Sequence, residues 1–139
     1  MLHLRIITPN KVILEEDIDS ITLPSHEGEI TILPKHENLF SLLDQGILKI
    51  KKNNKEDFLA IGGGYLETNG EYANVLVSRA YNQDQINEQV VNKALNEAKI
   101  LLNKSKTSEE RKEALSLIRR SVIDLKLLKK RKKYNYITT

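Results

Sequence analysis

The sequence predicts a β-rich amino-terminal half followed by a hairpin of two α-helices. Two observations carry this prediction. Up to about residue 78, apolar residues come in short runs separated by turn residues, which is the pattern of short strands. From Asn82 onward they recur at spacings of three and four, which is the pattern of amphipathic helices. We therefore expect one domain over residues 1–83 and a second over residues 84–139.

Seven short strands are expected in the first domain, over residues 2–8, 18–23, 29–33, 46–52, 56–61, 64–67 and 71–77. The dipeptides Asn53-Asn54 and Asn69-Gly70 fall between neighbouring strands, where two-residue hairpin turns favour these residue types. Short strands with frequent turns and no intervening helices favour an antiparallel sandwich or a flattened barrel over a parallel sheet.

The first helix is expected to begin near Asn82, with Gln85 as its partner in an N-terminal cap. Its predicted apolar stripe is Ile86, Val90, Ala94, Ala98 and Leu101. The second helix is expected to begin with a capping box formed by Thr107 and Glu110. Its predicted stripe is Ala114, Ile118, Val122, Leu125 and Leu128.

The polar stretch between these helices is short, so they should form an antiparallel hairpin. Because helices in proteins are stabilised mainly by burying an apolar face, the hairpin needs a surface to pack on. The first domain and a partner protein both remain possible surfaces at this point.

Charge is divided unequally between the two halves. Residues 1–83 contain 8 Lys/Arg against 12 Asp/Glu, and residues 84–139 contain 14 against 7. The two parts are therefore suited to different surroundings.

The chain has no cysteine, which excludes disulfides, thiolate metal sites and cysteine nucleophiles.

Three motifs that suggest chemistry are better explained by structure. The histidines and glutamates of residues 23–39 match no zinc spacing, so we predict no metal site. Gly62-Gly63-Gly64 lacks the Gly-Lys-Ser/Thr of a phosphate-binding loop and is interpreted as a bulge or a close backbone approach. The pair Glu15-Glu16 is expected in a polar turn. No acid, base and nucleophile occur together, so the sequence does not predict an enzyme.

A block of five consecutive cations, residues 129–133, follows the second helix. Cations at this position are favoured by the negative end of the helix dipole. The block could also contact nucleic acid or an anionic membrane, which would make the chain a binding module with a basic helix. An acidic protein partner explains the same charges equally well.

The order of these segments resembles the epsilon subunit of F-type ATP synthases over essentially the whole chain. The resemblance is carried by LPSHEGEITILPKHENLFSLLDQGILKI, FLAIGGGYLE, NVLVSRA and the two-helix tail. The typical first block of that family is similar to LPGxxGxxGILPGHAPLL. This chain keeps Leu23, Pro24, Gly28, Ile32, Leu33, Pro34, His36 and Leu39, and departs at Thr31, Lys35 and Asn38.

The resemblance implies an antiparallel β-sandwich of about ten strands followed by the helical hairpin. It implies a non-catalytic rotor subunit of the central stalk that binds the gamma subunit and the c-ring, and couples proton-driven rotation to ATP synthesis. Glu29 and His36 would face the c-ring loops. The subunit would lie on the cytoplasmic face of a bacterial plasma membrane, or the equivalent organellar face, and reach the membrane only through the complex.

The resemblance also implies that the hairpin can extend toward the catalytic head and inhibit ATP hydrolysis. The catalytic beta and alpha subunits would then be its partners. The cations expected to meet an acidic region of beta are Arg119, Arg120, Lys129, Lys130, Arg131, Lys132 and Lys133. No nucleic-acid partner is implied.

Some family members bind ATP on the folded hairpin through a motif similar to Ile/Leu-Asp-x-x-Arg-Ala. Here the corresponding residues run from Ile86 to Val91 and lack both the aspartate and the arginine. Asp124 occurs where some relatives carry arginine, and a carboxylate would repel phosphate. We therefore expect no cofactor, and ATP binding that is weak or absent.

Overall fold

The amino-terminal strand illustrates how the sequence selects this fold. Leu2, Leu4 and Ile6 of β1 (Leu2–Ile7) are fully buried, whereas the alternating His3 and Arg5 are partly exposed. A period of two is that of a strand with one face on a core.

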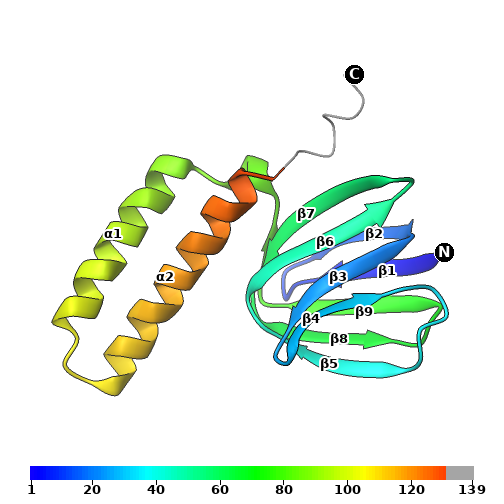
Figure 1. Cartoon of the computed structure of the whole chain (residues 1–139), viewed down its shortest axis with the longest axis horizontal. Helices are drawn as coiled ribbons and strands as arrows, with labels where there is room; N and C mark the ends of the chain where they lie inside the picture. The colour runs from blue at the N-terminus through cyan, green and yellow to red at the C-terminus, as the bar shows by residue number, and fades with distance from the viewer. Residues whose placement is uncertain (131–139) are drawn as a thin grey trace. The chain divides into compact units, whose positions relative to one another are not determined.

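The computed structural model describes residues 1–130, which divide into the units Met1–Asn82 and Gln83–Lys130 (Figure 1).

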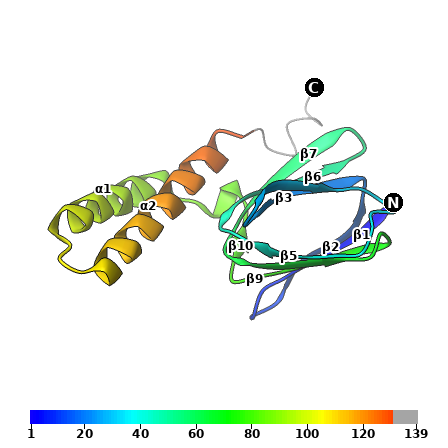
Figure 2. The ribbon, with the colours of Figure 1, turned by 60° about the horizontal axis from the view of Figure 1, so that its bottom comes forward.

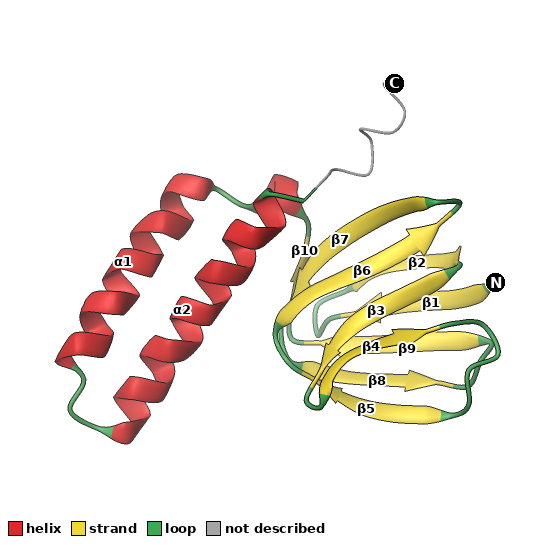
Figure 3. Cartoon of the chain, in the orientation of Figure 1, coloured by secondary structure: helices red, strands yellow, loops and turns green. Residues whose placement is uncertain are grey.

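The first unit is a β-sandwich of ten strands (Figures 1 and 3). One layer runs in the order β10 (Ala80–Tyr81), β7 (Lys55–Ile61), β6 (Gly46–Lys52), β3 (Ser20–Ser25) and β4 (Gly28–Ile32). The other runs in the order β5 (Leu39–Leu43), β8 (Gly64–Thr68), β9 (Tyr72–Val77), β1 and β2 (Val12–Ile18). Figure 2 shows the layers facing each other. The expected architecture, a sandwich of about ten strands followed by two helices, is confirmed.

One pair departs from the antiparallel pattern. β1 pairs in parallel with β9, with His3 opposite Tyr72 and Ile7 opposite Leu76. β1 also pairs antiparallel with β2, so it lies between two neighbours inside its layer. This placement explains why its inward side chains are fully buried.

The seven expected strands are present within a few residues of their expected bounds, but β2, β5 and β10 were not predicted. The expectation that Glu15-Glu16 forms a turn is wrong, because both residues lie in β2 and Glu15 is opposite Arg5. β2 forms the end of its layer, where outward-facing carboxylates remain hydrated. The strand was not predicted because its exposed face is polar.

Of the two predicted two-residue turns, one is confirmed and the other differs. Asn53 and Asn54 both adopt positive φ, 53° and 64°, and connect β6 to β7 as the predicted two-residue turn. Asn69-Gly70 was expected to behave likewise, but only Gly70 is left-handed, with φ 92°. The Asn69 side chain instead accepts hydrogen bonds from the backbone N–H groups of Glu71 and Tyr72, both at 3.0 Å. The connection is a three-residue loop stabilised by this asparagine.

The core of the sandwich consists of aliphatic side chains from both layers. Its largest fully buried members are Leu2, Leu4, Ile6, Ile18, Ile21, Leu23, Ile32, Leu43, Leu48, Ile50, Ile61 and Leu66.

The second unit begins with the 3-10 helix η1 (Gln83–Gln85), followed by α1 (Glu88–Lys104) and α2 (Ser108–Leu128). The expected cap at Asn82 is wrong. The N-cap of α1 is Asn87, whose side chain accepts a hydrogen bond from the Val90 N–H at 3.2 Å. The capping box of α2 is confirmed: Thr107 Oγ1 accepts from the Glu110 N–H at 3.1 Å, and Glu110 accepts from the Lys106 N–H at 3.0 Å.

The helices pack against each other, but the buried faces differ from the predicted stripes. In α1, Ala98 is buried as expected, but Val91 is buried in place of Val90, and the expected Val90, Ala94 and Leu101 are exposed. The buried face is therefore shifted by about one residue.

In α2, Ala114 is buried as expected. Ser121, Asp124 and Leu127 are the other buried positions, whereas the expected Val122 is exposed. Two polar residues thus occupy part of the buried face, which hydropathy alone does not identify.

Candidate interface surfaces

Glu29, the first residue expected in an interface, projects from the start of β4. It is exposed and lies opposite Pro24 of β3. The preceding Gly28 has φ 117°, which lets the chain turn tightly from β3 into β4. Glu29 is therefore an exposed carboxylate beside a tight turn.

His36, the second such residue, lies in the loop that follows β4. Its Nδ1 donates to the Glu37 carbonyl at 2.8 Å, and its N–H donates to the Leu33 carbonyl at 3.2 Å. The preceding Lys35 adopts φ 67° and donates its N–H to the Gly70 carbonyl at 2.8 Å. The loop is thus tied to the β8–β9 turn.

Glu29 consequently lies at the start of β4, whereas His36 lies beyond its other end, in the loop that leads to β5 (Figure 3 shows β4 and β5). Leu33, which lies between them in the sequence, is an exposed apolar side chain, 56% accessible.

An apolar row that the sequence analysis missed crosses the outer face of the second layer. Leu42 of β5 is opposite Tyr65 of β8, Tyr65 is opposite Leu76 of β9, and Leu76 is opposite Ile7 of β1. Residues paired across neighbouring strands point to the same side of a sheet. We call these four residues the apolar row.

Aromatic contact and an open groove extend the apolar row. Phe40 is 62% exposed and Leu42 51%, and the Phe40 ring stacks at 5.2 Å between centroids on Tyr65. A groove of about 370 Å³ lies along the other end of the row. Its lining is formed by Ile7, Thr8, Pro9, Gly63, Gly64, Tyr65, Leu76, Val77 and Ser78. Exposed apolar surface of this kind is typical of a protein–protein contact.

Charged residues border the apolar row on the same face. His3 hydrogen-bonds through Nδ1 to Asp17 and through Nε2 to Glu15, both at 2.8 Å. Arg5 Nε lies 3.5 Å from Glu15. The hydrogen bonds with Glu15 and then Asp17 raise the pKa of His3, and the bond with His3 lowers the pKa of Glu15. An apolar centre with a charged border is the usual anatomy of an interface.

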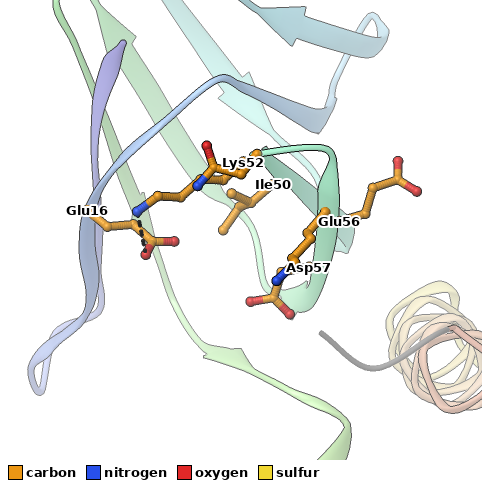
Figure 4. Close-up of a pocket in the computed structure, with 7 residues that line it drawn as sticks. Glu16, Ile50, Lys52, Glu56 and Asp57 are labelled. Atoms are coloured by element: carbon orange, nitrogen blue, oxygen red, sulfur yellow. Dashed lines mark ion pairs between the residues drawn. The ribbon is translucent and has the colours of Figure 1, made fainter. Parts of the chain in front are cut away.

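A second pocket, of about 200 Å³, opens beside β2, β6 and β7 (Figure 4). Ile50 forms its apolar wall, and Lys52 Nζ lies 3.8 Å from Glu16 Oε2 across it. The remaining lining residues are Asn53, Lys55, Glu56 and Asp57. This lining contains no histidine, serine or threonine.

The basic residues expected on α2 are exposed where the structure describes them. Arg119, Arg120, Lys129 and Lys130 are all solvent-accessible. Arg131, Lys132 and Lys133 lie outside the described residues.

Two further cations belong to this surface. Lys112, Arg119 and Lys126 are exposed and spaced by seven residues, which places them along one side of α2. We call these three residues the basic stripe. This seven-residue spacing can be found in the sequence, but the sequence analysis named the cations of residues 129–133 and did not identify Lys112 and Lys126.

Within residues 1–130, no group of three or more His, Asp or Glu side chains is arranged to hold a metal ion. Among the described helices, none is both long and apolar enough to cross a membrane.

Comparison with known proteins places these surfaces in context. The family model described as "ATP synthase, Delta/Epsilon chain, beta-sandwich domain" matches residues 1–83. The ATP synthase epsilon chain of Sulfurovum sp. is 39% identical over 109 residues, covering 78% of this chain and 84% of that relative. The epsilon chain of Herpetosiphon aurantiacus is 31% identical and covers 94% and 96% of the two chains.

Among solved structures, a chain of the Euglena gracilis mitochondrial ATP synthase, in a structure of OSCP/F1/c-ring, superposes with a TM-score of 0.78. The identity is 25%, and the match covers 90% of this chain and 79% of that one.

Proposed function

The chain belongs to the ATP synthase epsilon-chain family, and from this premise we propose that it is a non-catalytic rotor subunit that couples proton-driven rotation to ATP synthesis. The observation that carries this proposal is the family match over residues 1–83, the same residues that form the sandwich and its apolar row. No part of the proposal requires chemistry at the subunit itself.

The gamma subunit is the partner we assign to the apolar row. A rotor subunit must transmit torque through a permanent contact, and permanent interfaces have an apolar, well-packed centre. The apolar row supplies such a centre, and the His3, Arg5 and Glu15 side chains supply its charged border.

The polar loops of the c-ring are the partner we assign to the segment from Glu29 to His36. Glu29 is exposed and charged, and Leu33 and His36 extend the surface toward the next loop. The similar Euglena chain comes from a structure that includes a c-ring. The subunit would thus associate with the membrane only through the complex, on the cytoplasmic face in bacteria or the equivalent face in an organelle.

The hairpin is the part that we propose inhibits ATP hydrolysis. Its described residues expose six large apolar side chains, namely Val90, Ile100, Leu101, Leu115, Leu117 and Val122. Leu115 and Val122 each follow a cation of the basic stripe by three residues and so lie on the same side of α2, where they would suit an acidic, partly apolar protein face on the catalytic beta and alpha subunits. Charge would set the specificity and the rate of docking, and salt would weaken both.

Nucleotide is not expected to control the hairpin. Asn87, at the position of the family's aspartate, already uses its side chain to cap α1. Asp124, at the position of a phosphate-binding arginine, is buried and acidic. Isothermal calorimetry with ATP should therefore detect no tight binding, and a micromolar dissociation constant would overturn this proposal.

Two experiments test the proposed function. In co-purification with gamma, Leu42→Glu together with Leu76→Glu should abolish co-elution, because charge would enter the apolar row. Leu33→Glu, which changes an exposed apolar residue outside the apolar row, is the control and should retain co-elution with gamma. Retention by the double variant would reject the docking face, whereas failure of the unmodified chain to co-elute would reject the partnership itself.

The second experiment removes residues 84–139 in the assembled enzyme and measures ATP hydrolysis. Hydrolysis should rise if the hairpin is inhibitory. Unchanged hydrolysis with intact coupling would reject the inhibitory role and leave the rotor role standing.

A further inference from the structure

Gln83 makes an unusual connection within the second unit. Its Nε2 donates to the Leu127 carbonyl at 2.6 Å and also to the Lys130 carbonyl. The last carbonyls of an α-helix lack the usual donors within the helix and are satisfied from elsewhere. The Leu127 carbonyl also accepts from the Lys130 backbone N–H at 3.0 Å, so Gln83 adds a second donor to Leu127 and a donor to Lys130 from the other end of the unit.

This connection joins the two ends of the hairpin. Gln83 precedes α1, whereas Leu127, 44 residues further along the chain, is in the last turn of α2, and Lys130, 47 residues further along, follows the C-cap of α2. The Gln83 carbonyl accepts from the Ile86 N–H at 3.1 Å, which holds the residue in η1. The amide therefore extends from a fixed turn and does not belong to either long helix.

We propose that Gln83 is a clasp that keeps the hairpin closed and so opposes its inhibitory action. This inference rests on the inhibitory function proposed above. It adds the residue that favours the closed hairpin when no nucleotide is bound. Separating α2 from α1 requires both hydrogen bonds to break. Each net hydrogen bond shifts such an equilibrium by about 2- to 10-fold, so the clasp biases the hairpin without locking it.

The chemistry of the clasp requires a donor at residue 83. The primary amide of glutamine offers two N–H bonds from one nitrogen, one for each carbonyl. A carboxylate has no hydrogen to donate and would face the negative end of the α2 dipole. An ammonium group would donate and would also complement that dipole.

Hydrogen exchange measured by mass spectrometry on the full chain tests the clasp. Gln83→Ala removes both hydrogen bonds and should increase exchange in both α1 and α2 by about 4- to 100-fold, Gln83→Glu should increase it further, and Gln83→Lys should remain near the unmodified chain. Gln89→Ala, at an exposed glutamine of α1, is the control and should change nothing.

Two results would overturn the clasp. One is unchanged exchange in Gln83→Ala and Gln83→Glu. The other is faster exchange confined to the last turn of α2, which would make Gln83 a local cap only.

Hydrolysis by the assembled enzyme separates the clasp from the proposed inhibition. Gln83→Glu should lower ATP hydrolysis, because an open hairpin would be more available to the catalytic subunits. If exchange rises in both helices while hydrolysis is unchanged, the clasp stands and the inhibitory role of the hairpin fails.

Discussion

Gly64 passes so close to β9 that a Cβ added to it would lie 1.9 Å from the Leu76 carbonyl oxygen. This is a contact with backbone, which cannot rotate away. It explains the last glycine of the triplet as a close approach between strands, one of the two interpretations that the sequence favoured.

Gly64→Ala should therefore destabilise the sandwich by about 3 kcal/mol or more, because β8 and β9 would have to separate. Gly63→Ala is the matched control: its Cβ would meet the Leu43 carbonyl at 3.4 Å, which is near ordinary contact. Urea unfolding should show a large fall in the midpoint for the first variant only. Equal midpoints would contradict the packing described here.

The His3 cluster should make stability depend on pH. The folded-state pKa of His3 is raised above its ordinary 6.5, so its contribution is complete below that pH and is lost as pH rises through the raised pKa. The pKa of Glu15 is lowered from 4.5, so its contribution is complete above that pH and is lost as pH falls through the lowered pKa. The cluster therefore stabilises most between these two values.

His3→Gln should lower the melting temperature at about pH 5.5, where the contribution of His3 is complete, and this difference should shrink as pH rises through the raised pKa of His3. Added salt should reduce the difference, since these groups are solvent-exposed. A melting-temperature difference that is constant across the pH range would show that the ion pairs contribute nothing.

The α2 capping box should be required for the helix start. Thr107→Ala should cost about 1 kcal/mol, because the Glu110 N–H would lose its acceptor. Faster hydrogen exchange in the first turn of α2 is the measurement. Thr107→Ser keeps the hydroxyl and should behave like the unmodified chain, so a loss of protection in both variants would point to packing instead of capping.

The basic stripe should contribute to inhibition by the hairpin. Replacing Lys112, Arg119 and Lys126 by Glu should relieve inhibition of ATP hydrolysis several-fold, since exposed pairs are worth about 0.2–1 kcal/mol each. The matched control reverses three exposed lysines of α1, namely Lys93, Lys99 and Lys104. Equal effects from both sets would mean that net charge matters and the position of the stripe does not.

The architecture of the chain could be predicted because apolar periodicity reports burial directly. β1 alternates strictly, and the helices change the period to three and four. The strands that escaped prediction have a different environment: β5 exposes Phe40 and Leu42, and β2 exposes carboxylates. In both strands the exposed outer face interrupts the alternation of buried apolar and exposed polar residues, so the usual strand pattern is missing.

The candidate interface was harder to predict because it depends on register. Ile7, Leu42, Tyr65 and Leu76 are far apart in the sequence and become one row only through three strand pairings. The buried stripe of α1 was displaced for a related reason. Val90 and Val91 are equally apolar, and only the packed structure decides that Val91 is buried.

The parallel pairing of β1 with β9 has a consequence for how the chain acquires its structure. His3 and Ile7 find their partners only at Tyr72 and Leu76, so β1 cannot complete its place in the sheet until synthesis has passed β9. Such distant pairings slow folding relative to helical proteins. The helical hairpin emerges from the ribosome after that point, which gives the slower sandwich all of its strands before the faster helices form.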